Sequence, residues 1–220
     1  MTRMNGQIRE LVCASANPDK VREIEQLLDG VVVLRPRPIE IPDVDETEST
    51  LIGNARLKAR AIAQSPLNSL GLPAVADDTG LFVDALPGEL GVMTARYASD
   101  DLRHAVDPYA ANRRKLLAAL QERGCMDSSS RTAHFSTVVV VSFPDGREIA
   151  VEGRCDGTIA ARERGAQGFG FDPLFIPVPG MFDADVRTFA EMTDDEKNHL
   201  SHRGRAFRAL ARELKDSPTS

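Results

Sequence analysis

The chain has 220 residues, of which 42% are hydrophobic and 27% are charged, and its net charge is −6. This length is enough for one α/β domain or two small lobes with a substantial core. The acidic balance argues against non-specific attraction to nucleic acid or anionic lipid, so a phosphate-bearing ligand would have to be held by local basic groups or by a metal.

The first predicted elements are a buried strand, Leu11–Ala14, and a helix that begins after it. Asn17 is a natural N-cap, Pro18 a natural first helical residue and Gly30 a natural stop. The loop before the helix presents free backbone N–H groups and the positive end of a helix dipole, both of which suit phosphate. Lys20, in the first helical turn, belongs either to such an anion site or to an ordinary solvated surface, and this segment alone favours neither. The absence of G-x-x-x-x-G-K-[ST] and G-x-G-x-x-G elements here disfavours a P-loop ATPase and a Rossmann dinucleotide binder.

A second predicted strand, Val31–Leu34, precedes a proline-rich extended connection that ends in a group of acids: Asp43, Asp45, Glu46 and Glu48. Such a group is more often solvated surface than ligand, although one that leads into a helix could send a single carboxylate into a cleft. Ser49 or Thr50 is expected to cap the next helix, in which Asn54 and Lys58 lie four residues apart on one face.

The central stretch begins with a short buried strand, Ala74–Ala76, which is predicted to end at Asp77 and Asp78. Neighbouring side chains of a strand point to opposite faces, so the two aspartates are expected to share a target only if the strand turns there. Gly80 makes such a turn easy. The alternative is that this is a turn with no further role. The turn-rich segment 86–91 could line a cleft.

The next predicted helix is Tyr109–Arg123, and residues 112–115 are interpreted as its solvated face. A hairpin follows, formed by His134–Phe143 and Arg147–Cys155 around a Pro-Asp-Gly turn. The run of valines in its first strand indicates burial on both faces, and the hairpin is interpreted as structural.

Glycines alternate with phenylalanines in residues 165–175, which would let backbone and rings approach a flat ligand. Asp172 could accept a hydrogen bond from the edge of a base. A strand with aromatic core residues is the alternative, and we favour it for Phe175. Further on, residues 193–196 form a capping box, and Ser201-His202-Arg203 begins the last helix with a polar pair suited to ligand contact.

The arrangement of the cysteines and the hydropathy of the chain indicate the cellular compartment. The three cysteines are far apart and form no C-x-x-C pair, which fits a reducing environment and argues against a disulfide scaffold or a zinc site. The first ten residues lack an apolar signal region, and no apolar run approaches the length of a membrane span. A cytoplasmic location is therefore expected.

Taken together, a series of motifs from about residue 11 to residue 214 closely resembles, in order, the inosine/xanthosine triphosphate pyrophosphatase family. The motifs are Ser15-x-Asn17-x-x-Lys20, Glu46-Thr47, Asn54-Ala55-x-x-Lys58-Ala59, Ala76-Asp77-Asp78-Thr79-Gly80-Leu81, Leu86-Pro87-Gly88-x-x-Gly91, Ala95-Arg96-Tyr97, Gly168-Phe169-Gly170-Phe171-Asp172-Pro173, Phe189-Ala190-Glu191-Met192, Glu196-Lys197-Asn198 and Ser201-His202-Arg203.

The resemblance implies an α/β fold, with an elongated mixed sheet, flanking helices and two lobes around a central nucleotide cleft. It implies one such domain over residues 1–220 and a homodimer. The implied reaction is Mg²⁺-dependent hydrolysis of ITP, dITP or XTP between the α- and β-phosphates, giving the monophosphate and pyrophosphate. Partners in nucleic acid or membrane are not expected.

Residue roles follow from the same resemblance. The metal ligands would be Glu46, Asp78 and Asp77, and Asp78 would also be the general base that activates water. The residues placed at the substrate are Ser15, Ala16, Asn17, Pro18, Asp19, Lys20, Lys58, Thr79, Phe169, Gly170, Phe171, Asp172, Lys197, His202 and Arg203. In this set the first loop and Lys58 would hold the triphosphate, and residues from Phe169 onward would form the base pocket.

Two positions depart from the family pattern. Gly53 stands where a carboxylate is common, and Glu48 stands where a glycine is common. The acid that completes the metal shell is therefore open among Asp45, Glu46 and Glu48, with Glu46 the best match to the motif. Two other functions remain as alternatives: a different nucleotide preference on the same scaffold, and a nucleotide sensor that binds without turnover.

Overall fold

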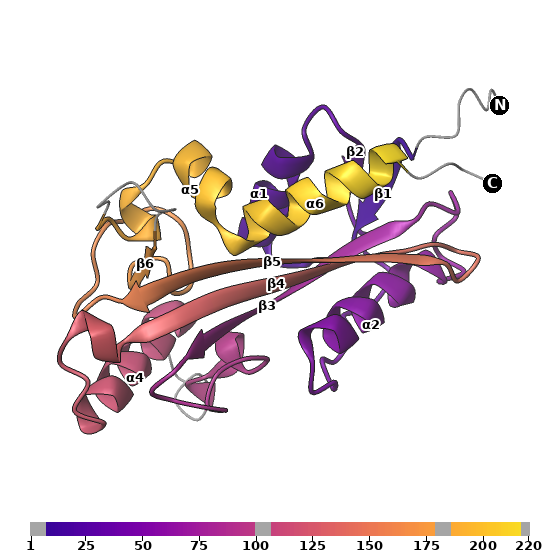
Figure 1. Ribbon diagram of the computed structural model, residues 1–220. Helices are drawn as coiled ribbons and strands as arrows, with labels where there is room; N and C mark the ends of the chain where they lie inside the picture. The colour runs from indigo at the N-terminus through magenta and orange to yellow at the C-terminus, as the bar shows by residue number, and fades with distance from the viewer. Residues whose placement is uncertain (1–7, 100–106, 179–185, 217–220) are drawn as a thin grey trace. The chain divides into compact units, whose positions relative to one another are not determined.

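Six strands form one sheet in the order β2-β1-β3-β4-β5-β6 (Figure 1). The computed structural model describes residues 8–99, 107–178 and 186–216. The strands and helices are β1 (Glu10–Cys13), α1 (Pro18–Leu28), β2 (Val33–Arg35), α2 (Leu51–Ala63), β3 (Ala74–Val83), α4 (Pro108–Glu122), β4 (Thr132–Ser142), β5 (Glu148–Ile159), β6 (Phe175–Pro177), α5 (Asp194–Leu200) and α6 (His202–Asp216). Because β1 pairs in parallel with β2 and β3 while β5 and β6 are antiparallel, the sheet is mixed, and the predicted α/β class with a mixed sheet and flanking helices is confirmed.

The chain divides into two compact units, each described here by itself. The first unit comprises residues 1–78, 138–153 and 205–220, and the second comprises residues 79–137 and 154–204. In the described part of the chain, no helix combines the length and apolarity that crossing a bilayer requires.

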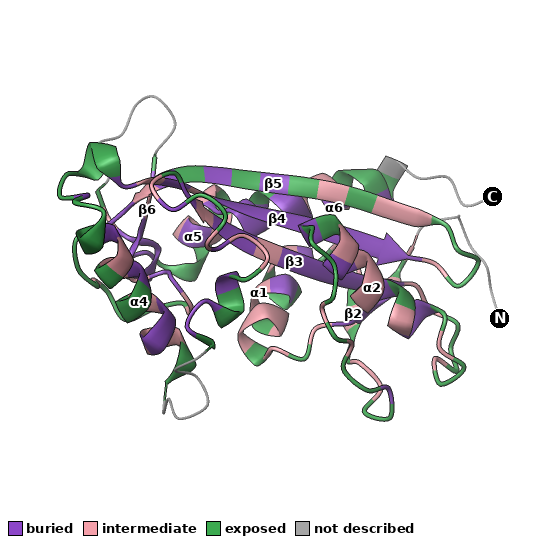
Figure 2. Cartoon of the chain, turned by 90° about the horizontal axis from the view of Figure 1, so that it is seen from below, coloured by how far each residue is buried: buried purple, intermediate pink, exposed green. Residues whose placement is uncertain are grey.

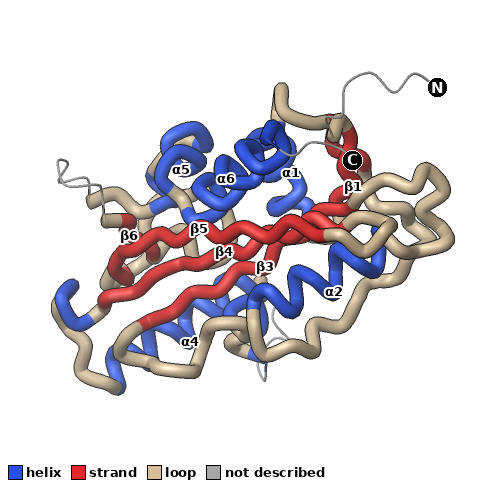
Figure 3. Tube along the Cα trace, turned by 45° about the vertical axis from the view of Figure 1, so that its right-hand side comes forward, coloured by secondary structure: helices blue, strands red, loops and turns tan. Residues whose placement is uncertain are grey.

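In the first unit, helices α1 and α6 lie on one face of the strands and α2 lies on the other (Figures 1 and 3). Ile24 of α1 and Phe207 of α6 are fully buried in one apolar cluster with Val75 of β3 and Val139 of β4. The predicted two-sided burial of the valine run is confirmed, since β4 is buried along most of its length whereas β5 alternates (Figure 2).

In the second unit, α4 packs through Leu116 and Leu120 against an apolar cluster that includes Phe135 and Phe175. The side chain of Phe175 is fully buried and its ring lies 4.7 Å from that of Phe135, centroid to centroid. The interpretation of Phe175 as a core residue is therefore confirmed.

The prediction that the central strand ends at Asp77 is wrong. Strand β3 continues to Val83, and Gly80 lies within it rather than in a turn. The close approach of a neighbouring segment explains the glycine: a Cβ at position 80 would lie 2.9 Å from the carbonyl oxygen of Gly91, whose backbone bridges to Leu81. The segment 86–91 thus packs against β3.

The interpretation of residues 112–115 as a solvated helix face holds for Arg114 and Lys115, which are exposed, but is wrong for the two residues before them. Asn112 is buried, accepts a hydrogen bond from the amide of Ala98 and donates one to the carbonyl of Ala95. Arg113 donates to the carbonyl of Gly170, 2.9 Å away. Asn112 and Arg113 thus form hydrogen bonds with backbone groups outside their helix. The polar pattern of the helix sequence does not reveal these distant partners.

Candidate functional site

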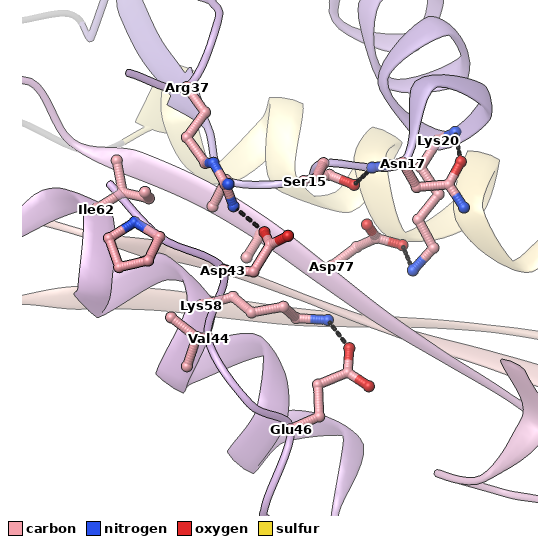
Figure 4. A pocket seen from close by; sticks show the side chains of 14 residues that line it. Ser15, Asn17, Lys20, Arg37, Asp43, Val44, Glu46, Lys58, Ile62 and Asp77 are labelled. Carbon is pink, nitrogen blue, oxygen red and sulfur yellow. Dashed lines mark hydrogen bonds and ion pairs between the residues drawn. The ribbon is translucent and has the colours of Figure 1, made fainter. Parts of the chain in front are cut away.

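A polar cavity of about 240 Å³ lies in the first unit, where β1 ends and α1 begins (Figure 4). The last paired residues of β1 and β3 are Cys13 and Val75, so Asp77 lies beyond the point where β1 covers the edge of β3. This open edge at the carboxyl end of parallel strands is where α/β sheets place their ligand sites. Residues 14–17 line the cavity on the α1 side.

The loop into α1 is built as predicted. Asn17 is the N-cap, and its side-chain oxygen accepts from the backbone amides of Asp19 and Lys20 at 2.9 and 3.3 Å. Pro18 is the first helical residue, and Ser15 Oγ accepts from the amide of Asn17 at 3.2 Å. The start of α1 therefore presents a preorganised polar loop and the positive end of a helix dipole to the cavity.

The two adjacent aspartates are held by lysines from two different helices. Lys20 Nζ of α1 lies 3.3 Å from Asp77 Oδ2, and Lys58 Nζ of α2 lies 2.9 Å from Asp78 Oδ1. Neighbouring strand residues alternate in direction, and α1 and α2 lie on opposite faces (Figure 1). A turn is therefore not needed to bring both carboxylates to cationic partners.

Glu46 joins this group from the proline-rich connection. Lys58 Nζ donates to Glu46 Oε1 at 3.0 Å as well as to Asp78, so one carboxylate from a loop and one from β3 meet at one ammonium group. Asn54 Nδ2 lies 3.4 Å from Asp78 Oδ2, which confirms that Asn54 and Lys58 share a helix face directed at this acid. Of the three acids left open by the sequence, Glu46 is the one that lines the cavity.

The donor set fits a hard divalent cation. Mg²⁺ prefers oxygen ligands and keeps several waters, so one or two protein carboxylates are enough. The described residues contain no group of three or more His, Cys, Asp or Glu side chains arranged to hold a metal by themselves. A cation here would accordingly use Glu46, Asp77 or Asp78 together with water and ligand oxygens.

Burial and the neighbouring charges have opposite effects on the pKa of Asp78 and on that of Lys58. Burial raises the pKa of Asp78 above its ordinary value, against the opposing effect of the Lys58 and Lys20 charges. Burial alone would lower the pKa of Lys58, but the carboxylates of Asp78, Asp77 and Glu46 outweigh it and raise that pKa. Lys58 is therefore fully cationic at neutral pH, beside a carboxyl group of increased basicity.

The two departures from the family pattern fit one another. A Cβ at Gly53 would lie 2.6 Å from Glu48 Cβ and 2.8 Å from Glu48 Cγ. The backbone amide of Glu48 also donates to Asn54 Oδ1 at 3.0 Å, which holds this part of the loop in place. The side chain at position 48 thus fills the space that a side chain at position 53 would need.

A second cluster of polar side chains lies inside the second unit, around Asp172. Lys197 Nζ donates to Asp172 Oδ2 at 2.7 Å, and both side chains are almost fully buried. The same oxygen accepts from the amide of Phe169 at 2.8 Å. A Cβ at Gly168 would fall 2.1 Å from Asp172 Oδ2, so only glycine leaves room for this arrangement.

Arg203 and Lys197 both face the ring of Phe169. The Arg203 guanidinium carbon lies 5.5 Å, and Lys197 Nζ 5.0 Å, from the ring centroid. Arg203 Nη2 also donates to Thr79 Oγ1 at 3.2 Å. The ring of His202 is buried and stacked at 4.3 Å on Phe135, so it packs within the aromatic core of this unit.

The structure therefore gathers most of the predicted site residues into two groups. Ser15, Ala16, Asn17, Lys20, Glu46, Lys58 and Asp77 line the cavity of the first unit. Phe169, Asp172, Lys197 and Arg203 contact one another in the second unit. Pro18, Asp19 and Asp78 do not line the cavity: the first two lie in the first turn of α1, and Asp78 contacts the cavity residue Lys58. Arg37, which was not predicted from the sequence, lines the same cavity and forms an ion pair with Asp43, an acid of the group that precedes α2.

The fold and the first of these groups define an α/β protein that presents acids and lysines around a helix N-terminus. The model of the Ham1 family matches residues 11–213, and the chain belongs to that family. It is similar to a protein of Caulobacter vibrioides named dITP/XTP pyrophosphatase, with 42% identity over 94% of this chain and 98% of that protein. The protein of the same name from Rhodospirillum centenum is 44% identical over 91% of this chain and 92% of its own length.

Solved structures agree with this assignment. A HAM1 protein from Coxiella burnetii superimposes with a TM-score of 0.78 at 36% sequence identity. The match covers 95% of this chain and all of that one. The recognised family, the fold and the order of the motifs are thus consistent with each other.

Proposed function

We propose that this chain hydrolyses non-canonical purine nucleoside triphosphates, among them ITP, dITP and XTP, to the monophosphate and pyrophosphate. Membership of the Ham1 family and the names of its relatives support this activity. The observation that carries the proposal is the double contact of Lys58 with Glu46 and Asp78, beside the Lys20–Asp77 pair. The cytoplasmic location expected from the sequence and the homodimer implied by the family resemblance are part of the same proposal.

The chain's own residues have distinct tasks in this reaction. A triphosphate carries about four negative charges, which repel an attacking oxygen unless they are neutralised, and Lys20 and Lys58 supply positive charge. Glu46 together with Asp77 or Asp78 would hold Mg²⁺, which would further neutralise the phosphates and acidify water. Asp78, whose pKa is raised by burial, accepts a proton from the attacking water.

Selection of the base is assigned to the second unit. Hypoxanthine and xanthine differ from adenine in carrying an oxygen at position 6. Hydrogen-bond donors of a pocket that face position 6 pair with that oxygen. Opposite a 6-amino group the same donors stay unpaired, which strongly disfavours adenine. Arg203, Lys197 and the backbone near Phe171 are the candidate donors.

The reaction is tested by measuring pyrophosphate release from ITP, dITP, XTP, ATP and GTP, with and without Mg²⁺. We expect turnover of the first three to exceed that of ATP and GTP, and to need the metal. Comparable rates for all five would contradict the proposed selectivity. Binding of ITP without any release of pyrophosphate would instead indicate a nucleotide sensor.

Replacing Arg203 by alanine tests the base pocket separately. Because Arg203 faces Phe169 and is a candidate donor to the 6-oxo group, we expect the ratio of kcat/KM for XTP over ATP to fall, while the Mg²⁺ concentration for half-maximal activity stays the same. Loss of one charged donor is expected to cost about tenfold or more in this ratio. A changed metal requirement with unchanged base preference would move Arg203 out of the base pocket.

A further inference from the structure

The cavity at the start of α1 is lined by three cationic side chains within the described part of the chain: Lys20, Arg37 and Lys58 (Figure 4). Arg37 lies in the proline-rich connection after β2. Although this connection runs over the surface, the Arg37 side chain is only 19% exposed. It is directed toward Asp43, with which it forms an ion pair.

The three cations differ in how firmly their acidic partners hold them. Lys20 pairs with Asp77, whose side chain is 0% exposed. Lys58 is shared between Asp78, at 9% exposed, and Glu46. The partner of Arg37 is Asp43, whose side chain is 72% exposed.

Exposure of the partner decides how easily each cation can change partners. An ion pair with a solvated carboxylate contributes little, because water and salt screen it and the released acid is readily hydrated. Removing a cation from a buried carboxylate leaves an uncompensated charge, which is far more costly. Lys20 and Lys58 are thus held in place by acids of the site, whereas Arg37 can leave Asp43 at little cost.

We propose that Arg37 is an additional substrate-binding residue, which exchanges Asp43 for the polyphosphate group of the bound nucleotide. The planar guanidinium presents paired donors that match two phosphate oxygens, which a lysine cannot do. Asp43 acts as a positioning residue that keeps Arg37 at the cavity and competes with phosphate for it. This inference deepens the proposed function and rests on it.

The proposal predicts opposite effects on polyphosphate binding when Arg37 and Asp43 are replaced. We would measure binding of inorganic tripolyphosphate by isothermal titration calorimetry, without metal and at fixed ionic strength. Arg37→Ala is expected to weaken binding about tenfold, the size of one charge-assisted hydrogen bond. Asp43→Asn is expected to tighten binding about threefold, because only a weak exposed competitor is removed. Arg37→Lys should fall between Arg37→Ala and the unaltered chain.

Two matched controls separate this exchange from general effects of charge. Arg35, two residues away, forms an exposed pair with Glu10 and does not line the cavity, so Arg35→Ala should leave binding unchanged. Glu40→Gln removes an exposed carboxylate of the same connection and should also have no effect. Tighter binding by Glu40→Gln equal to that of Asp43→Asn would overturn the proposal, since any nearby charge would then suffice.

Other outcomes also decide the matter. If Arg37 and Asp43 form only a structural latch, both replacements weaken binding, and that result overturns the exchange. If tripolyphosphate binding follows the expected pattern but dITP and XTP are not hydrolysed by the unaltered chain, the proposed function fails while the role of Arg37 stands. If the unaltered chain hydrolyses dITP and XTP but Arg37→Ala binds tripolyphosphate as tightly as the unaltered chain does, the role proposed for Arg37 is wrong while the proposed function stands.

Discussion

Asp78→Asn is expected to lower kcat for dITP at least about 100-fold, the usual contribution of a general base. Asparagine keeps the size of the side chain but cannot accept a proton from water at neutral pH. It also removes the charge that binds Lys58 Nζ at 2.9 Å. The measurement is steady-state pyrophosphate release at saturating Mg²⁺ and substrate.

A matched control for this variant is Asp156→Asn, which alters an exposed aspartate of β5 that pairs with Arg154. Its kcat should equal that of the unaltered chain. Circular dichroism should show that both variants are folded. Near-normal turnover by a folded Asp78→Asn protein would mean that another group activates the water.

Lys197→Met is expected to lower the free energy of unfolding by about 3–5 kcal/mol. Lys197 and Asp172 are both about 4% exposed, so removing the lysine leaves a carboxylate buried without its cation. The amide of Phe169 still donates to that carboxylate, but a neutral hydrogen bond does not replace an ion pair at 2.7 Å. Urea unfolding followed by circular dichroism measures the change.

Two further variants test the cause of this loss. Adding Asp172→Asn to Lys197→Met should recover part of the lost stability, because the buried charge is then gone. Arg154→Met on the surface should change the free energy of unfolding by less than about 0.5 kcal/mol. If the double variant is less stable than Lys197→Met alone, lost packing rather than the stranded charge is responsible.

Features set by neighbouring residues could be predicted from the sequence. The N-cap at Asn17 with Pro18 following it, and the capping box at Thr193, depend on side chains that bond to backbone within three residues. The cap of α2 was left open between two residues, and the structure assigns it to Thr50. Strand β2 begins two residues later than predicted, since its pairing with β1 rather than its composition fixes where it starts.

Features set by distant contacts could not be predicted in this way. Gly80 resembled a turn residue because nothing nearby in the sequence reveals that Gly91 packs against it. Asn112 resembled a surface residue because its partners lie in a loop before the helix. Arg37 was missed for the same reason: its place at the cavity depends on how the proline-rich connection folds back beside α1.

The contact between Glu48 and Gly53 makes these two positions interdependent. Enlarging residue 53 alone forces the stem of the Glu48 side chain out of its place, and the stem, unlike the tip, cannot simply swing aside. Glu48 is itself exposed, so shortening residue 48 alone opens that space to solvent. A larger residue at position 53 therefore needs a shorter one at position 48, so a library that varies position 53 alone would miss every chain in which the acid has moved there.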